Sequence, residues 1–232
     1  MTPALRQLST ADGERRCLFL PPAGGSVGTL REIATVDAAW GAEYPGRGAR
    51  SAEPLPATLE ELAERLALEF ICRFGENGVT RTMLIGFSMG AFLALEMARR
   101  AFAHCGAEPA ALVVVGAVAP QRRSPCCHPH TDHDLVRLLD RDGLVPPEVR
   151  EYALDLLRDD MALMEKYRGP AGVTVSCPLM ALCGADDPAC TTDAWRQWTT
   201  GPFHTALVPG GHLDLLKPGR GSEFWRVIEP LR

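Results

Sequence analysis

Residues 86–90, Gly-Phe-Ser-Met-Gly, fit the pattern Gly-x-Ser-x-Gly. An apolar segment at 82–85 precedes this pentapeptide, and a helical pattern at 91–100 follows it. A nucleophile elbow requires this strand–turn–helix context, in which the serine occupies a sharp, strained turn. We therefore predict that Ser88 exposes its hydroxyl at the end of a strand, where it can attack an acyl carbonyl.

A serine hydroxyl is a weak nucleophile until a base removes its proton, and a carboxylate must hold that base in one tautomer. In α/β-hydrolases the three residues follow the chain order serine, acid, histidine. Of the six histidines, only His204 and His212 lie downstream of a plausible acid. His212 follows a predicted strand at 204–208 and a glycine turn, so it reaches the edge of the sheet that carries Ser88. His204 begins that strand and is expected at the opposite edge.

Two adjacent aspartates, Asp186 and Asp187, follow a predicted strand at 179–183. A carboxylate directly after a parallel strand lies at the same edge of the sheet as the elbow. Adjacent side chains point apart, so only one of the two can contact the histidine. We predict Asp187, which stands three residues after Gly184, the usual offset in this fold; Asp186 is the alternative.

Two backbone amides are candidates for stabilising the negative charge of a tetrahedral intermediate. The N–H of Met89 lies at the start of the helix after the elbow and points toward the reacting carbonyl oxygen. A second donor is expected from the loop at 21–26, where glycines permit close approach to a ligand. We predict the N–H of Ala23 as this donor, with that of Gly24 as the alternative.

The elements that must position these groups alternate between short apolar runs and helical patterns. This alternation predicts an α/β fold with a mostly parallel sheet and helices on both faces. The predicted strands are residues 16–20, 82–85, 111–115, 179–183 and 204–208, with a weaker strand at 38–44. A helix is predicted over 58–74, because Thr58 and Glu61 form a capping box and apolar residues recur at helical spacing.

Residues 120–170 differ in sequence pattern from the rest of the chain, because they contain no strand-like run. Two amphipathic segments, 134–139 and 147–164, predict helices there. We expect a helical insertion over one end of the sheet, within a single domain that spans 1–232.

The composition is that of an ordinary globular chain: 232 residues, 46% hydrophobic, 23% charged, with a formal net charge of −5. Acidic side chains outnumber basic ones, so the chain has no positive field that would attract phosphates, and no nucleic-acid partner is expected. The longest apolar stretch, 82–95, is too short and too interrupted to span a membrane. We therefore expect a cytoplasmic monomer without a membrane partner.

Eight cysteines occur without a Cys-x-x-Cys pair, so we expect free and mostly buried thiols. The segment 126–133 is rich in cysteine and histidine but lacks the paired spacing of zinc sites, so no metal is expected. Arg47 is equally consistent with binding a phosphate and with pairing to a surface carboxylate.

Several motifs occur in an order and at a spacing typical of one family. These motifs are residues 20–26, 44–48, 53–54, 86–90, 157–160 with Tyr167, 184–188 and 210–212. Over nearly its whole length the chain resembles the type II thioesterases of polyketide and nonribosomal peptide synthesis, which include the medium-chain fatty acyl thioesterases of fatty acid synthase. It departs from the family pattern at Pro22, where histidine is usual, and at Leu213, neither of which is a predicted triad residue.

The resemblance implies an α/β-hydrolase fold with a helical lid at 120–170. It implies that the substrate is an acyl thioester on the phosphopantetheine arm of an acyl or peptidyl carrier protein domain of a synthase, and that stalled or wrong acyl groups are hydrolysed. The chain would need no cofactor of its own, because phosphopantetheine belongs to the carrier protein. Three alternatives remain open: a carboxylesterase of small esters, an acyltransferase and a non-catalytic carrier-binding subunit.

Overall fold

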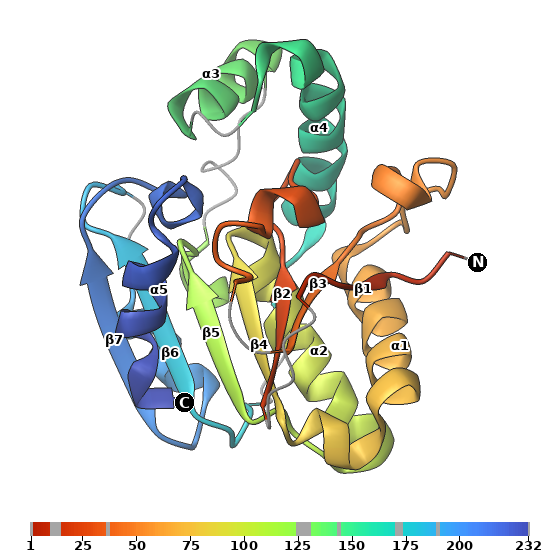
Figure 1. Ribbon diagram of the computed structural model, residues 1–232, viewed down its shortest axis with the longest axis vertical. Coiled ribbons are helices and arrows are strands. Elements are labelled where there is room, and N and C mark those ends of the chain that lie inside the picture. The colour runs from red at the N-terminus through yellow and green to blue at the C-terminus, as the bar shows by residue number, and fades with distance from the viewer. Residues whose placement is uncertain are drawn as a thin grey trace.

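Seven strands form one sheet in the computed structural model, which describes residues 2–9, 15–35, 38–123, 131–142, 145–169, 174–188 and 191–231. The strands are β1 (Leu5–Gln7), β2 (Arg16–Leu20), β3 (Ala38–Ala42), β4 (Thr82–Phe87), β5 (Ala111–Val115), β6 (Leu179–Gly184) and β7 (Phe203–Val208). Their order across the sheet is β1-β3-β2-β4-β5-β6-β7, and only β1 pairs antiparallel, with β3. The parallel strands end at one common edge of the sheet, the upper edge in Figure 1.

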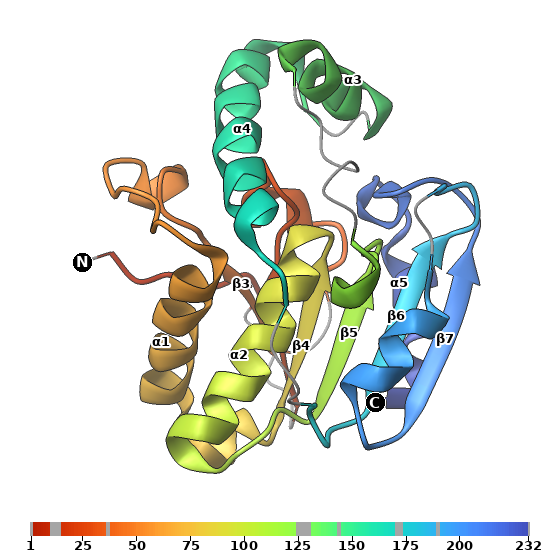
Figure 2. The ribbon, with the colours of Figure 1, turned by 180° about the vertical axis from the view of Figure 1, so that it is seen from behind.

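Helices cover both faces of this sheet. Helices α1 (Leu59–Val79) and α2 (Met89–Cys105) cover the face turned toward the viewer in Figure 2, and α5 (Gly221–Val227) covers the other. Successive side chains of a strand point to opposite faces. Leu18 of β2 accordingly joins the apolar core beneath α1 and α2, while its neighbour Phe19 packs against Phe224 of α5.

The predicted fold class is confirmed, and each predicted strand is present with its ends moved by no more than two residues. Strand β1 and helix α5 have no counterpart among the predicted elements. A strand as short as β1 carries too few residues to show alternation. Helix α1 begins as predicted, because the Thr58 side chain accepts a hydrogen bond from the Glu61 N–H at 3.1 Å. Beyond Phe74 it continues to Val79, across non-helical backbone at Gly75.

Both amphipathic segments of the insertion form helices, α3 (Asp132–Asp142) and α4 (Arg150–Lys166). The two lie beyond the ends of the parallel strands in both views (Figures 1 and 2). An ion pair between Arg158 of α4 and Asp132 of α3, 2.9 Å long, joins them. The insertion therefore occupies the edge at which the elbow was predicted.

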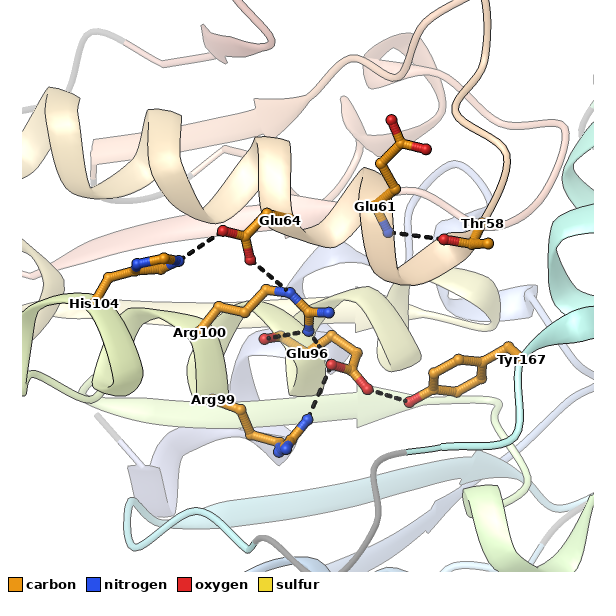
Figure 3. A network of polar contacts seen from close by, with 8 residues as sticks. All are labelled: Thr58, Glu61, Glu64, Glu96, Arg99, Arg100, His104 and Tyr167. Carbon is orange, nitrogen blue, oxygen red and sulfur yellow. Dashed lines mark hydrogen bonds and ion pairs between the residues drawn. The ribbon is translucent and has the colours of Figure 1, made fainter.

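A polar network connects α1, α2 and the end of α4 (Figure 3). The carboxylate of Glu96 on α2 is buried and accepts hydrogen bonds from Arg100 and from the Tyr167 hydroxyl, the latter at 3.1 Å. Arg100 also contacts Glu64 of α1 at 3.0 Å. Burial raises the pKa of Tyr167 far above its ordinary value, so the phenol stays neutral and donates. The network thus anchors the chain just after α4 to the body of the domain.

The expectation for the cysteines is correct in part. Among the described residues Cys17, Cys72, Cys105 and Cys177 form no disulfide, and the first and last of these are buried. Cys183 is disulfide-bonded, so for this residue the expectation is wrong. Spacing along the chain does not show which thiols meet in space. No helix in the described part of the chain is both long and apolar enough to cross a membrane.

Two leucines on α1 test how strongly the packing of this helix stabilises the fold. Leu66 is 1% exposed and Leu68 is 44% exposed. We expect Leu66→Ala to lower the free energy of unfolding by about 2–5 kcal/mol, because it leaves a cavity in the core. Leu68→Ala should change it by no more than about 0.5 kcal/mol. Urea denaturation followed by circular dichroism measures both, and equal losses would contradict the packing described.

Candidate active site

Ser88 occupies the turn between β4 and α2, as predicted. Its backbone has φ 50° and ψ −112°, and it is the one non-glycine residue with positive φ in the described part of the chain. Such a conformation is strained for a residue with a side chain and persists only where the surroundings enforce it. A hydrogen bond from the Ser88 N–H to the Val115 carbonyl, 2.8 Å long, ties the turn to β5.

The glycines on either side of Ser88 permit backbone contacts that no larger residue allows. A Cβ atom at Gly86 would lie 2.1 Å from the carbonyl oxygen of Gly90, and one at Gly90 would lie 2.2 Å from that of Leu20. The start of α2 therefore rests directly on the ends of β4 and β2. This close approach is the physical reason for glycine at both positions of the pentapeptide.

The structure brings the three predicted triad residues together. His212 Nε2 lies 3.1 Å from Ser88 Oγ, and His212 Nδ1 lies 2.6 Å from Asp187 Oδ2. An ionised carboxylate can only accept a hydrogen bond, so Nδ1 carries the proton and Nε2 is left to accept one from the serine hydroxyl. This arrangement suits removal of the serine proton by the imidazole.

Of the two adjacent aspartates, Asp187 faces the histidine. Its side chain is 2% exposed, whereas Asp186 is exposed to solvent and its N–H donates to the Gly210 carbonyl at 3.0 Å. A Cβ atom at Gly184 would lie 2.3 Å from the Gly211 carbonyl oxygen. The loop that carries the acid and the loop that carries the histidine are thus locked together by backbone contacts, which fix Asp187 beside the imidazole.

The other candidate histidine lies where its position in the sequence predicts. His204 is the second residue of β7 and lines a cavity of about 610 Å³ together with Arg15 and Arg81, residues that directly precede β2 and β4. These are the starting ends of parallel strands. His204 is therefore at the edge of the sheet opposite Ser88.

The predicted oxyanion donors differ in how their amides are used. The Gly24 N–H donates to Asp160 Oδ2 at 2.8 Å, so the alternative donor is engaged within the fold. The Ala23 N–H has no hydrogen-bond partner among the described residues, and Ala23 lines a cavity with Ser88. Met89 is the first residue of α2, where an N–H has no partner inside the helix. Ala23 and Met89 therefore remain the predicted pair.

Sequence reasoning missed the partner of Arg47. Arg47 forms a bidentate ion pair with Asp160 of α4, with N–O distances of 2.8 and 2.7 Å, and both side chains are fully buried. Neither expectation for Arg47 is correct, because its partner is neither a phosphate nor a surface carboxylate. Burial alone would lower the pKa of Arg47, but the hydrogen bonds and charge of Asp160 outweigh it and raise the pKa. No local signal joins the two residues, which stand 113 positions apart.

Ser88 and His212 open into a small, mainly apolar cavity of about 110 Å³. Its walls include side chains of the insertion and of the body of the domain. They are Leu138, Leu139, Val145, Leu157 and Met161 from the insertion, and Pro22, Ala23, Thr29 and Leu213 from the body. The cavity can therefore hold an apolar chain next to the serine hydroxyl.

No cluster of metal-ligating side chains is present within the described residues. Most of the cysteine- and histidine-rich segment at 126–133 lies outside them, since 124–130 are not described. The geometry of the site fits acyl transfer through a serine nucleophile.

Comparisons with known proteins point to one family. A family model described as thioesterase domain matches residues 16–231. The chain is 32% identical to the thioesterase PikA5 of Streptomyces venezuelae, over 93% of this chain and 85% of that protein. It is 34% identical to a probable cadicidin biosynthesis thioesterase of Streptomyces griseus, over 98% of this chain, and spans 66% of the length of that relative.

A solved structure shows a similar fold. The type II thioesterase BorB from the borrelidin biosynthetic cluster superposes with a TM-score of 0.83 and is 35% identical, with 100% of this chain and 98% of that chain covered. The likeness thus extends over the sheet, the elbow and the insertion together.

The two aspartates provide a matched test of the site. We expect Asp187→Asn to reduce kcat for ester hydrolysis by about 10⁴-fold, because an amide in place of the carboxylate favours the wrong histidine tautomer. Asp186→Asn should leave kcat within about twofold, because its side chain faces solvent. Steady-state kinetics with a p-nitrophenyl ester measures both. A larger loss in the Asp186 variant would transfer the role of the acid to that residue.

Proposed function

Since this chain belongs to the type II thioesterase family, we propose that it hydrolyses acyl thioesters on the phosphopantetheine arm of a carrier protein, through a Ser88–His212–Asp187 triad. The observation that carries this proposal is the unbroken series of hydrogen bonds from Asp187 through His212 to Ser88 at an apolar cavity. The strained backbone of Ser88 adds support, since strain of this kind accumulates at functional sites. This strain also argues against the alternative of a non-catalytic carrier-binding subunit.

In the acylation step the Ser88 Oγ attacks the thioester carbonyl carbon while His212 Nε2 takes the hydroxyl proton. The carbonyl oxygen becomes an oxyanion, which accepts hydrogen bonds from the N–H groups of Met89 and Ala23. Collapse of this tetrahedral intermediate breaks the carbon–sulfur bond. The pantetheine sulfur leaves with the proton from His212, and the acyl group stays on Ser88 as an ester.

Deacylation repeats the same steps with water as the nucleophile. His212 takes a proton from water, the resulting hydroxide attacks the acyl-Ser88 carbonyl, and the same amides stabilise the oxyanion. The proton on His212 then returns to Ser88 Oγ as the ester bond breaks. The products are a free carboxylic acid and the regenerated enzyme.

The insertion acts in this proposal as the lid and as one wall of the acyl pocket. Leu157 and Met161 of α4 and Leu138 of α3 face the cavity at Ser88, so the acyl chain lies between them and the body of the domain. Movement of α3 would admit the pantetheine arm.

The partner in this proposal is an acyl or peptidyl carrier protein domain of a synthase that makes a polyketide, a nonribosomal peptide or a fatty acid. The enzyme removes stalled or aberrant acyl groups from that carrier. It acts in the cytoplasm as a monomer, without a cofactor, a nucleic acid or a membrane. The formal net charge of −5 supports the absence of nucleic-acid and membrane partners, because the chain lacks the basic excess that nucleic acids and anionic membranes attract.

Rates on matched substrates test the proposal. We expect wild-type enzyme to release the same acyl group at least tenfold faster, by kcat/KM, from a carrier protein than from acyl-pantetheine or a p-nitrophenyl ester, because contacts with the carrier add binding energy. Ser88→Ala should abolish release, since no nucleophile remains. Mass spectrometry of the products measures the rates and identifies the acceptor.

Two of the alternatives give distinct results in that assay. A rate indifferent to the carrier would indicate a carboxylesterase of small esters. Transfer of the acyl group to an added alcohol or amine in preference to water would indicate an acyltransferase. Release that persists in the Ser88→Ala variant would contradict the serine mechanism itself.

A further inference from the structure

The loop that carries Ala23 is held in place by a charged residue of the insertion. Asp160 of α4 accepts a hydrogen bond from the Gly24 N–H through Oδ2, at 2.8 Å. The same oxygen accepts a second from Arg47, also at 2.8 Å, and Oδ1 accepts a third from Arg47 at 2.7 Å. The carboxylate is fully buried, so these bonds face no competition from water.

Two further contacts to the same loop come from Tyr44 and Arg47, which follow β3 in the chain. Arg47 donates to the Gly25 carbonyl at 2.8 Å, and the Tyr44 hydroxyl donates to the Pro21 carbonyl at 2.9 Å. Burial raises the pKa of Tyr44 well above its ordinary value, so its hydroxyl keeps the proton that it donates. The loop is therefore fixed on both sides of Ala23 by buried polar groups.

The bond to Asp160 orients one particular peptide unit. In a trans peptide the N–H and C=O point in opposite directions. Because the Gly24 N–H points at Asp160, the Ala23 carbonyl points away from it, so the peptide plane that follows Ala23 is fixed. Gly24 has φ 71°, and a Cβ there would lie 3.1 Å from Cβ of Leu157 on α4, so the peptide packs directly on the helix.

From these contacts we infer that Asp160, paired with Arg47, is a positioning residue that fixes the loop so that the Ala23 N–H is presented to the oxyanion. This inference rests on the proposed serine mechanism. Helix α4 then has two roles, because Leu157 and Met161, which flank Asp160 on this helix, also line the acyl pocket. The pocket wall and the oxyanion donor are therefore set by one rigid helix.

Replacing both members of the ion pair tests this role without leaving a buried charge unpaired. An apolar pair of similar volume often preserves the stability that a buried ion pair had. The variant Arg47→Met/Asp160→Leu removes the acceptor for the Gly24 N–H. The matched variant Arg47→Met/Asp160→Asn retains an acceptor oxygen at almost the same place. The two differ chiefly in that one hydrogen bond.

The readout separates positioning of the oxyanion donor from substrate binding. In an alkyl trifluoromethyl ketone, Ser88 Oγ adds to the carbonyl carbon, the hydroxyl proton passes to His212 Nε2, and the carbonyl oxygen becomes an oxyanion. A thioether of pantetheine with the same chain length only fills the pocket. We expect the leucine variant to bind the ketone about 10- to 100-fold more weakly than wild type, with thioether affinity within about threefold. The asparagine variant should recover most of the ketone affinity that the leucine variant loses, because it restores the hydrogen bond to the Gly24 N–H, whereas the contact of Arg47 with the Gly25 carbonyl is lost in both variants.

Tyr167→Phe is the control for a loss of stability in the same region. It deletes the hydrogen bond to the buried Glu96 that anchors the chain after α4 (Figure 3). We expect a lower Tm and unchanged ketone affinity, because the loop at Ala23 is not touched. If the leucine variant does not fold, Arg47→Met/Asp160→Ala removes the same acceptor and takes its place.

The possible failures are distinguishable. A folded leucine or alanine variant that binds the ketone as tightly as wild type would overturn the inference, and so would an equal loss of ketone and thioether affinity. Failure of the asparagine variant to recover would overturn it as well, because the hydrogen bond to Gly24 would then not be the cause. A wild-type enzyme to which the ketone does not add would instead overturn the serine mechanism, and the inference with it.

Discussion

Direct contact between backbones at the turn from β4 to α2 is the constraint on which the rest of the site depends. Without side chains at Gly86 and Gly90, the first turn of α2 rests on the ends of β4 and β2, and Ser88 is forced to positive φ. A strained residue of this kind costs about 1–3 kcal/mol. The buried strand and helix on either side hold it in place, so the hydroxyl keeps one position without any movement of the chain.

The remaining groups reach Ser88 from distant parts of the chain, and backbone contacts set their positions. His212 and Asp187 stand on loops after neighbouring strands, and these loops are locked together at Gly184 and Gly211. The loop that carries Ala23 is held differently, by buried side chains. The site therefore combines a rigid elbow, set by local backbone contacts, with groups from elsewhere in the chain whose positions depend on tertiary packing.

Local signals in the sequence were sufficient to predict the fold and to predict that Ser88, Asp187 and His212 lie together. The elbow, the strand that ends before Asp187 and the glycine turn before His212 each combine a strand with the turn residues that follow it. The ion pair of Arg47 with Asp160 could not be predicted, because charged residues are expected at the surface and the partners stand 113 positions apart. The disulfide of Cys183 is a similar case, since the meeting of two thiols depends on the folded structure.

The most direct test of the central claim is to locate the acyl group on the enzyme during turnover. Wild-type protein would be mixed with an acylated carrier protein, quenched in acid within milliseconds, digested and analysed by mass spectrometry. The account predicts an added acyl mass on the peptide that contains Ser88, formed and lost at rates that match turnover. An acyl group on any other side chain, or full turnover during which the Ser88 peptide is never acylated, would contradict it.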